Sequence, residues 1–316
     1  MTFRMAVRLF CSLNYMKVSY LKMNKYFVKR MVCASLMLFS LAAVETFAQR
    51  YQVAACDWMM LKRQKLGEFQ LARDIGADGV EVDMGPLGTR VLFENKLREE
   101  PDRSIFRRTA DSLGVKVPSM AMSGFFAQNL LKRDNYRDLI SDCLQTMQHM
   151  GATVAFLPLG GSGHDWECPD SAAYAQMADR LHDIGQMAAA QGLTVGIRTA
   201  MGAAFDVAFL RRIDSPGIKV YYNLQDAVDG GRDVCRELEL LGPDRICQIH
   251  ASLTDSVTLD RDPRIDLPAV RRTLDGMGWS GWLVVERSRD VSKVRDVRWN
   301  FSANVRYLKE VFKEEK

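Results

Sequence analysis

The feature that most constrains the fold is a repeated pattern in which an amphipathic helix ends at a glycine and a short apolar strand follows. The pattern occurs in LARDIGADGVEVD, TADSLGVKVPSMAM, MQHMGATVAFLPL, MAAAQGLTVGIRT, LELLGPDRICQIH and LDGMGWSGWLVVE. The glycines suit the left-handed backbone position just after a helix; they are Gly76, Gly114, Gly151, Gly192, Gly242 and Gly278. Helices and strands therefore alternate along most of the chain.

With the opening segment YQVAACDW and the segment GIKVYYN, the pattern predicts eight strands. Their expected ranges are about 51–57, 79–84, 116–122, 153–159, 194–199, 219–225, 245–251 and 282–287. Alternating strands and helices give parallel strands joined by crossover helices. Eight such units predict a (β/α)8 TIM barrel. A doubly wound open sheet is the alternative, but the sequence has no GxGxxG motif after the first strand and no Walker-type loop.

The N-terminal part of the chain has the composition of a targeting signal rather than of a fold. Residues 23–48 combine basic residues, an apolar run and small residues around Ala48, which predicts a secretory signal peptide and a periplasmic or secreted protein. We interpret residues 1–22 as the result of a start codon assigned too far upstream. Residues 49–316 are interpreted as a single barrel domain. An N-terminal membrane anchor is the alternative, although the apolar run is short for a membrane span.

The net positive charge of the chain comes from residues 1–48. Seven of the 43 Lys and Arg residues and one of the 39 Asp and Glu residues lie in residues 1–48, which leaves 36 basic and 38 acidic residues. The remaining chain has no bulk positive charge that would favour nucleic acid or an anionic membrane. Its five cysteines are odd in number and form no CxxC pair, so we expect buried thiols rather than a zinc or disulfide framework, with a single bridge as the alternative in an oxidising compartment.

Several strands end in polar residues, which matters because TIM barrels place their chemistry at the carboxyl ends of their strands. His250 and Glu286 end the apolar segments RICQIH and WLVVE, where a charge is costly unless it has a partner or a task. We therefore predict that both face an active site. The other candidates for this face are Glu81, Asp83, His164, Arg198, Asn223 and Gln248. Glu81 can instead pair with an arginine of the barrel, and His164 can be an exposed loop residue.

The segments GVEVDMG, NLQDA, ICQIHASLTDS and GWLVVERS resemble the sugar phosphate isomerase/epimerase family of xylose isomerase-like barrels, and the resemblance covers nearly all of residues 51–314. It implies a divalent metal (Mn, Mg or Zn) and proton transfer next to a sugar carbonyl. The implied ligands are a carboxylate on strand 5, an aspartate on strand 6, a histidine on strand 7 and a glutamate on strand 8. His250 and Glu286 match, but Arg198 and Asn223 stand in place of the two other acidic ligands.

Arg198 opposes metal binding, because a guanidinium cannot lose its proton and repels a nearby cation. Three hypotheses follow. The first is an exported sugar isomerase or epimerase, or a keto-glycoside lyase, in which Arg198 replaces the metal and Glu286 or His250 removes the proton. The second is a non-catalytic carbohydrate-binding barrel in which Arg198 pairs with Glu286. The third is a metal-dependent isomerase whose ligands are His250, Glu286 and Asn223.

The first hypothesis assigns catalysis to Glu286 and His250. Substrate binding is assigned to Arg198, Glu81, His164, Asn223 and Gln248. The expected partner is a small sugar or keto-sugar, with no nucleic acid and no stable membrane anchor once the signal peptide is removed.

Overall fold

Eight parallel strands close into a barrel in the computed structural model, which describes residues 50–60 and 63–313. The strands are β1 (Tyr51–Cys56), β2 (Gly79–Asp83), β3 (Ser119–Ala121), β4 (Val154–Pro158), β5 (Thr194–Arg198), β6 (Ile218–Asn223), β7 (Ile246–His250) and β8 (Gly281–Val285). They follow one another around the barrel in chain order, and β1 pairs with β8 in parallel from Tyr51–Gly281 to Ala55–Val285. This pairing confirms the TIM barrel and excludes the open sheet.

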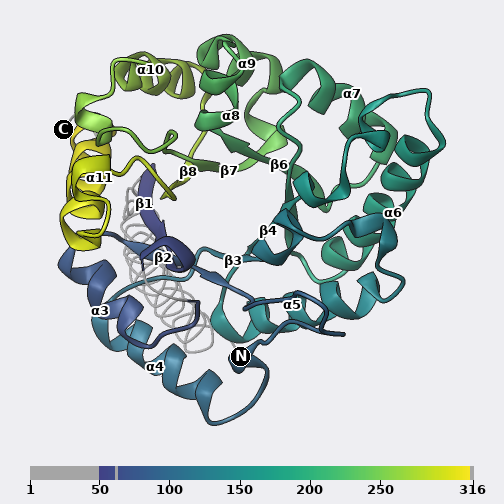
Figure 1. The fold of residues 1–316 in the computed structure, drawn as a ribbon, viewed down its shortest axis with the longest axis horizontal. Helices are drawn as coiled ribbons and strands as arrows, with labels where there is room; N and C mark the ends of the chain where they lie inside the picture. The colour runs from purple at the N-terminus through teal and green to yellow at the C-terminus, as the bar shows by residue number, and fades with distance from the viewer. Residues whose placement is uncertain (1–49, 61–62, 314–316) are drawn as a thin grey trace, which may run out of the picture. The chain divides into compact units, whose positions relative to one another are not determined.

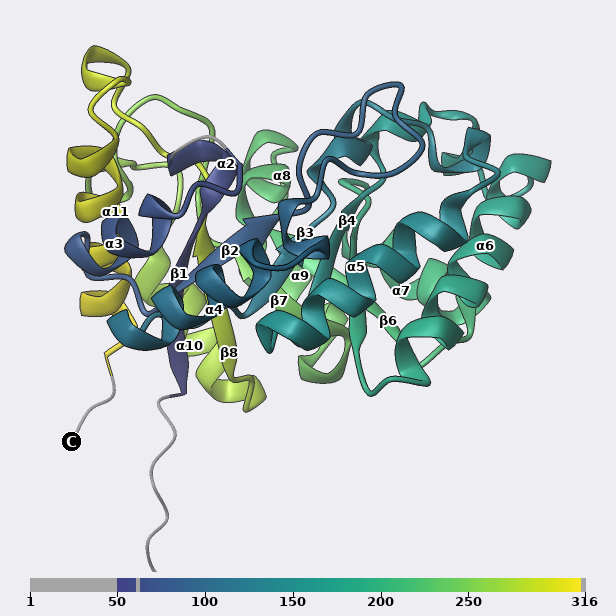
Figure 2. The ribbon, with the colours of Figure 1, turned by 90° about the horizontal axis from the view of Figure 1, so that it is seen from below.

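Helices surround the ring of strands, as Figure 1 shows. They are α2 (Asp57–Met60), α3 (Gly67–Asp74), α4 (Asp102–Leu113), α5 (Tyr136–Met150), α6 (Ala172–Ala189), α7 (Ala203–Ile213), α8 (Leu224–Asp229), α9 (Val234–Leu241), α10 (Leu267–Met277) and α11 (Val297–Val311). Helices α2 and α8 begin directly after β1 and β6 and lie at the same end of the barrel (Figure 2). This end therefore carries the carboxyl ends of the strands.

The glycine pattern marks helix ends as expected. Gly114, Gly151 and Gly278 follow α4, α5 and α10 with φ angles of 66°, 76° and 72°. These are left-handed values that glycine adopts without steric cost. Strand β3 is shorter than the predicted range of 116–122, because Pro118 has no N–H to donate to the sheet.

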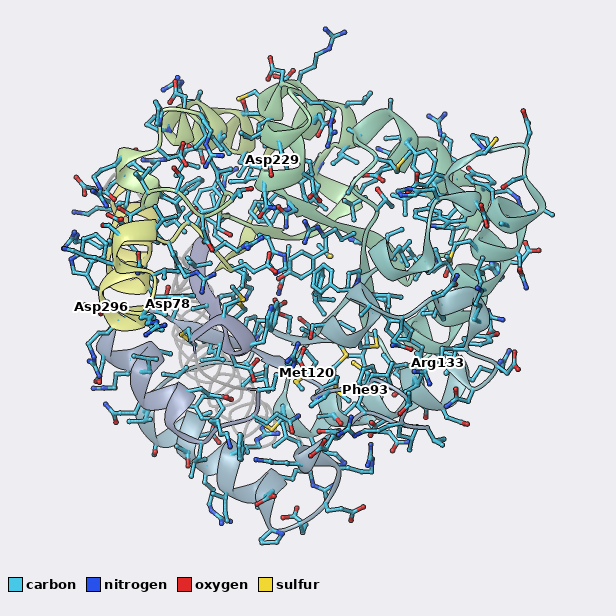
Figure 3. The ribbon with its side chains drawn as sticks, in the orientation of Figure 1. Asp78, Phe93, Met120, Arg133, Asp229 and Asp296 are labelled. Atoms are coloured by element: carbon cyan, nitrogen blue, oxygen red, sulfur yellow. The ribbon has the colours of Figure 1, made fainter. Side chains whose placement is uncertain are left out.

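Two apolar layers support the barrel. The larger lies between the strands and the helices, and includes Phe69, Leu144 and Phe209. A smaller cluster lies inside the ring of strands and includes Phe156 and Tyr221. Side chains fill the space that the strands enclose (Figure 3), so the barrel is a packed core rather than a pore.

The predicted signal peptide lies outside the described residues. Among the helices that are described, none is both long and apolar enough to cross a membrane. The five cysteines of the barrel carry free thiols; they are Cys56, Cys143, Cys168, Cys235 and Cys247.

Replacing Gly196 with alanine should destabilise the barrel, because β5 passes very close to its neighbours at this residue. An added Cβ would lie 2.5 Å from Cys247 Sγ and 3.0 Å from Tyr221 Cβ. We expect the free energy of unfolding to fall by about 1–3 kcal/mol, as for other overpacked cores. Urea denaturation measures the change. Gly160→Ala is the control, because open space surrounds Gly160; equal stability of the two variants would contradict the prediction.

Candidate active site

A buried hydrogen bond between Glu81 of β2 and His250 of β7 lies at the centre of the carboxyl ends of the strands. His250 Nε2 is 2.9 Å from Glu81 Oε1, and neither side chain is exposed to solvent. The other carboxylate oxygen, Glu81 Oε2, accepts hydrogen bonds of 2.7 Å from the hydroxyls of Ser119 and Tyr221. Burial and the charge of Glu81 raise the pKa of Tyr221 well above its ordinary value, so its hydroxyl remains a donor.

Glu81 fixes which nitrogen of His250 carries a proton. Because a carboxylate only accepts hydrogen bonds, Nε2 carries a proton, and in the neutral form of the ring Nδ1 is the nitrogen without one. The other nitrogen, Nδ1, is buried and has no hydrogen-bond partner among the described residues. Aromatic rings hold the imidazole in place: the ring centroids of Tyr221 and Phe156 lie 4.4 and 4.7 Å from it. The result is an oriented imidazole whose free nitrogen is a proton acceptor.

Glu286 follows β8 and lies between this imidazole and a cation. Its Oε2 is 3.7 Å from His250 Nδ1 and 3.9 Å from Arg198 Nη1. Both distances are longer than a hydrogen bond. The side chain of Glu286 is 7% exposed, whereas that of His250 is fully buried, so Glu286 is nearer to solvent.

Arg198 makes its short contacts with Asp226 of α8. Nε donates to Oδ2 at 2.8 Å and Nη2 donates to Oδ1 at 2.6 Å. This is the bidentate geometry that a guanidinium and a carboxylate form best. Burial lowers the pKa of Arg198, but Asp226 and Glu286 outweigh that effect and raise it, so the cation is retained. The guanidinium also lies 5.4 Å from the ring centroid of Phe126.

The other predicted site residues, Asn223, Gln248 and His164, lie at three different places in the barrel. Asn223 ends β6, and its Oδ1 accepts a hydrogen bond from Gln225 N at the start of α8, while its buried Nδ2 has no partner among the described residues. Gln248 lies deeper in the barrel and donates to Pro118 O at 3.4 Å. The side chain of His164 is 92% exposed and contacts Glu167. The structure therefore brings Glu81, His250, Glu286 and Arg198 together, and leaves His164 outside this cluster.

The residues present do not fit the divalent metal that the resemblance implies. The guanidinium of Arg198 is close to Glu286, and the Oδ1 of Asn223 already caps α8. Of the four ligand positions that the resemblance implies, only His250 Nδ1 and Glu286 offer free lone pairs to a metal, which is too few for a tight site. Within residues 50–60 and 63–313, no group of three or more His, Cys, Asp or Glu residues is arranged to hold a metal ion.

An aromatic wall and a buried acid pair lie in the segment after β1. The ring of Trp58 stacks on Phe156, with centroids 6.3 Å apart, and is also 6.3 Å from the ring of His250. Next to Trp58, the carboxyl of Glu68 is buried close enough to that of Asp57 for the two to interact electrostatically. Each has one oxygen that accepts a backbone N–H and one buried oxygen without a donor. A proton shared by the pair supplies the missing donor.

The electrostatics of the acid pair agree with a shared proton. Burial, with a further contribution from Asp83, raises the pKa of Asp57 to about 8. Burial and the neighbouring Asp57 raise the pKa of Glu68 well above its ordinary value. Burial also raises the pKa of Asp83, to about 6, although Arg63 opposes the rise.

Sequence reasoning missed three residues of this site: Asp226, Tyr221 and Trp58. A buried arginine needs a carboxylate, and Asp226 in the first turn after Asn223 was a candidate partner. Tyr221 was recognisable as an inward-facing residue of β6, since strand residues alternate between faces. Trp58 carried no signal beyond its position just after the first strand.

Removing the hydroxyl of Tyr221 should destabilise the protein, because Tyr221→Phe takes a hydrogen bond from the buried carboxylate of Glu81. Hydrogen bonds to charged groups contribute about 1.5–3 kcal/mol. We expect a loss of this size in the free energy of unfolding, measured by urea denaturation. Tyr174→Phe is the matched control, because no hydrogen bond of the Tyr174 hydroxyl exists among the described residues. A loss no larger than that of the control would show that Tyr221 does not support Glu81.

The acid pair should make the protein less stable as the pH rises. The folded protein holds a proton on Asp57 up to about pH 8, whereas the unfolded chain releases it near the ordinary value of 3.8. This contribution to stability is complete below pH 4 and is lost as the pH rises to 8, at up to about 1.4 kcal/mol per pH unit for one proton. In Asp57→Asn, the free energy of unfolding should fall less steeply between pH 6 and pH 8 than in the wild type.

Urea denaturation at a series of pH values measures this slope. Asp111→Asn is the control, because Asp111 lies on the surface of α4, and its slope should match that of the wild type. Identical slopes for Asp57→Asn and the wild type would mean that Asp57 does not carry the proton.

Comparison with known proteins agrees with this architecture. A family model described as xylose isomerase-like TIM barrel matches residues 69–311. A search of curated proteins gave no match. The solved structure of D-psicose 3-epimerase in the presence of D-fructose aligns with a TM-score of 0.66 and 14% identity, covering 83% of this chain and 100% of that one.

Two further solved structures show the same fold. The 3-keto-D-glucoside 4-epimerase from E. coli aligns with a TM-score of 0.64 and 15% identity over 82% of this chain and 99% of that one. A sugar phosphate isomerase/epimerase from Parabacteroides distasonis aligns with a TM-score of 0.65 and 12% identity over 85% and 97% of the two chains.

Proposed function

This chain belongs to the xylose isomerase-like TIM barrel family, and we propose that it catalyses proton transfer at a carbon next to the carbonyl group of an uncharged sugar. The observation that carries this proposal is the position of Glu286. Its Oε2 lies between the free Nδ1 of His250 and the guanidinium of Arg198, and forms a short ion pair with neither. A carboxylate in this position is available as a base.

Arg198 supplies the positive charge that stabilises the intermediate. Nε and Nη2 are bound to Asp226, so Nη1 remains to donate to a substrate oxygen. A fixed donor directed at an oxygen that becomes negative in the transition state can lower the barrier by several kcal/mol. We propose that Arg198 performs this task without a metal, since the donor set does not fit one.

The proposed step moves one proton and two electron pairs. Glu286 takes the proton, the C–H electron pair forms a carbon–carbon double bond, and the carbonyl π pair moves to oxygen, giving an enolate next to Arg198. His250, oriented by Glu81, can accept the proton from Glu286 on Nδ1. Return of a proton to the same carbon restores the carbonyl, and return from the opposite face gives the epimer.

The charges around the reacting groups favour a neutral substrate. Glu81, Asp226 and Glu286 are opposed by the single guanidinium of Arg198, so the group is negative whether or not His250 is protonated. A phosphate or carboxylate next to the reacting carbon would be repelled. Two of the structurally similar proteins are named as epimerases of D-psicose and of a 3-keto-D-glucoside. Uncharged sugars also suit the export that we propose from the signal sequence in residues 23–48.

The alternative is a carbohydrate-binding barrel that has lost its chemistry. In that case Arg198 would form a bidentate pair with Glu286 and block the base. The bidentate partner of Arg198 is instead Asp226, while Glu286 is 3.9 Å away. This arrangement favours the enzyme.

Exchange of solvent deuterium into a sugar tests the proposal. The wild-type protein is incubated in D2O with D-fructose and with a 3-keto-glucoside, and NMR measures deuterium at the carbon next to the carbonyl. In Glu286→Gln, exchange should fall by at least about 100-fold, because the base is lost. Its melting temperature should stay near that of the wild type, which separates a lost base from a lost fold.

A chelator tests the proposed absence of a metal requirement. Exchange should continue unchanged after dialysis against EDTA, and added Mn²⁺ or Mg²⁺ should not increase it. Loss of exchange with EDTA and its return with metal would support the metal-dependent alternative. Unchanged exchange in Glu286→Gln would remove Glu286 as the base.

A further inference from the structure

We propose that Asp226 is a positioning residue that holds Arg198 away from Glu286 and thereby keeps Glu286 free to act as a base. This inference rests on the proposed function for its catalytic consequence, but the competition between the two carboxylates stands on the geometry alone. Arg198 is one cation between two acidic partners, and the distances show which partner holds it: 2.6 Å to Asp226 and 3.9 Å to Glu286.

Asp226 can hold the guanidinium because α8 fixes its position. The helix begins directly after β6, and the side chain of Asn223 caps it by accepting from Gln225 N. Leu224 and Ala227 are buried, which anchors the helix against the barrel. The carboxylate therefore meets Arg198 with little freedom to move, and two parallel hydrogen bonds set the direction of the guanidinium plane.

Without this hold, Arg198 has a second acceptor close by. Its Nη1 needs to move only about 1 Å to reach the usual N⁺–H···O⁻ distance from Glu286. Both side chains are largely buried, so their attraction is weakly screened by solvent. A short ion pair would stabilise the charged carboxylate and lower its tendency to take a proton. Loss of Asp226 would thus convert an available base into an occupied one.

The experiment begins with crystal structures of the wild type and Asp226→Asn. Asparagine keeps the shape of the side chain but removes its charge. We expect the guanidinium of Arg198 to lie within hydrogen-bond distance of Glu286 in the variant and to remain on residue 226 in the wild type. Asp226→Ser serves as a second variant if asparagine prevents folding.

The matched control is Asp229→Asn. Asp229 lies on the same helix (Figure 3) and also contributes negative charge near Arg198, but its contacts are with Thr254 and Arg264. The control changes the net charge by the same amount and leaves both short bonds of Arg198 in place. Arg198 should keep its position in this variant.

Deuterium exchange into the same two sugars gives the functional readout. In Asp226→Asn, the exchange rate should fall by at least about 100-fold. The acid side of its pH profile should move to lower pH, because an ion-paired carboxylate keeps its charge in more acidic solution. A merely structural role for Asp226 would lower the rate without moving this profile.

A double variant shows whether Asp226 acts through Arg198. When Arg198→Met is already present, adding Asp226→Asn should change the rate by less than about threefold, since the residue that Asp226 positions is gone. Independent losses that multiply would contradict the inference.

The two proposals fail in different ways. If the wild type exchanges deuterium with neither sugar, the proposed function is wrong for these substrates, and the crystal structures still decide the role of Asp226. If Arg198 stays away from Glu286 in Asp226→Asn, the positioning role is wrong, whatever the rate.

Discussion

The hydrogen bond between Glu81 and His250 is the interaction on which the site depends. Removing a carboxylate and an imidazole from water costs several kcal/mol unless each finds its partners. Here the imidazole and the hydroxyls of Ser119 and Tyr221 supply three partners for Glu81. The same bond leaves Nδ1 as the free nitrogen of His250, so an interaction that stabilises the barrel also orients its proton acceptor.

A second constraint on the chemistry of the site is the number of carboxylates that surround the guanidinium of Arg198. A metal site would need several acidic ligands facing a single point. In this barrel the acidic groups pair with fixed partners instead: Glu81 with His250, and Asp226 with Arg198. Of Glu81, Asp226 and Glu286, only Glu286 has no short contact with a basic side chain among the described residues. The protein therefore presents one available carboxylate next to one fixed cation, which suits proton transfer to and from a carbon next to a carbonyl.

The segment after β1 connects this chemistry to the stability of the fold. The ring of Trp58 packs against the rings of Phe156 and His250 and so forms one side of the space around the imidazole. The neighbouring carboxyl of Asp57 is buried with Glu68, and the pair is satisfied only while it holds a proton. We therefore expect a rise in pH to destabilise the fold through the segment that carries this aromatic wall.

The sequence by itself determined the barrel and the positions of His250 and Glu286 at the carboxyl ends of their strands. These follow from local rules: glycine ends a helix, apolar periodicity marks the buried faces, and parallel strands bring their carboxyl ends to one side. Only the tertiary structure decided the partners. The sequence placed Arg198 beside either a substrate or Glu286, whereas the fold gave it Asp226. The choice between two carboxylates depends on a difference of about 1 Å in the distances between side chains on separate strands and helices, and no local sequence pattern specifies such a difference.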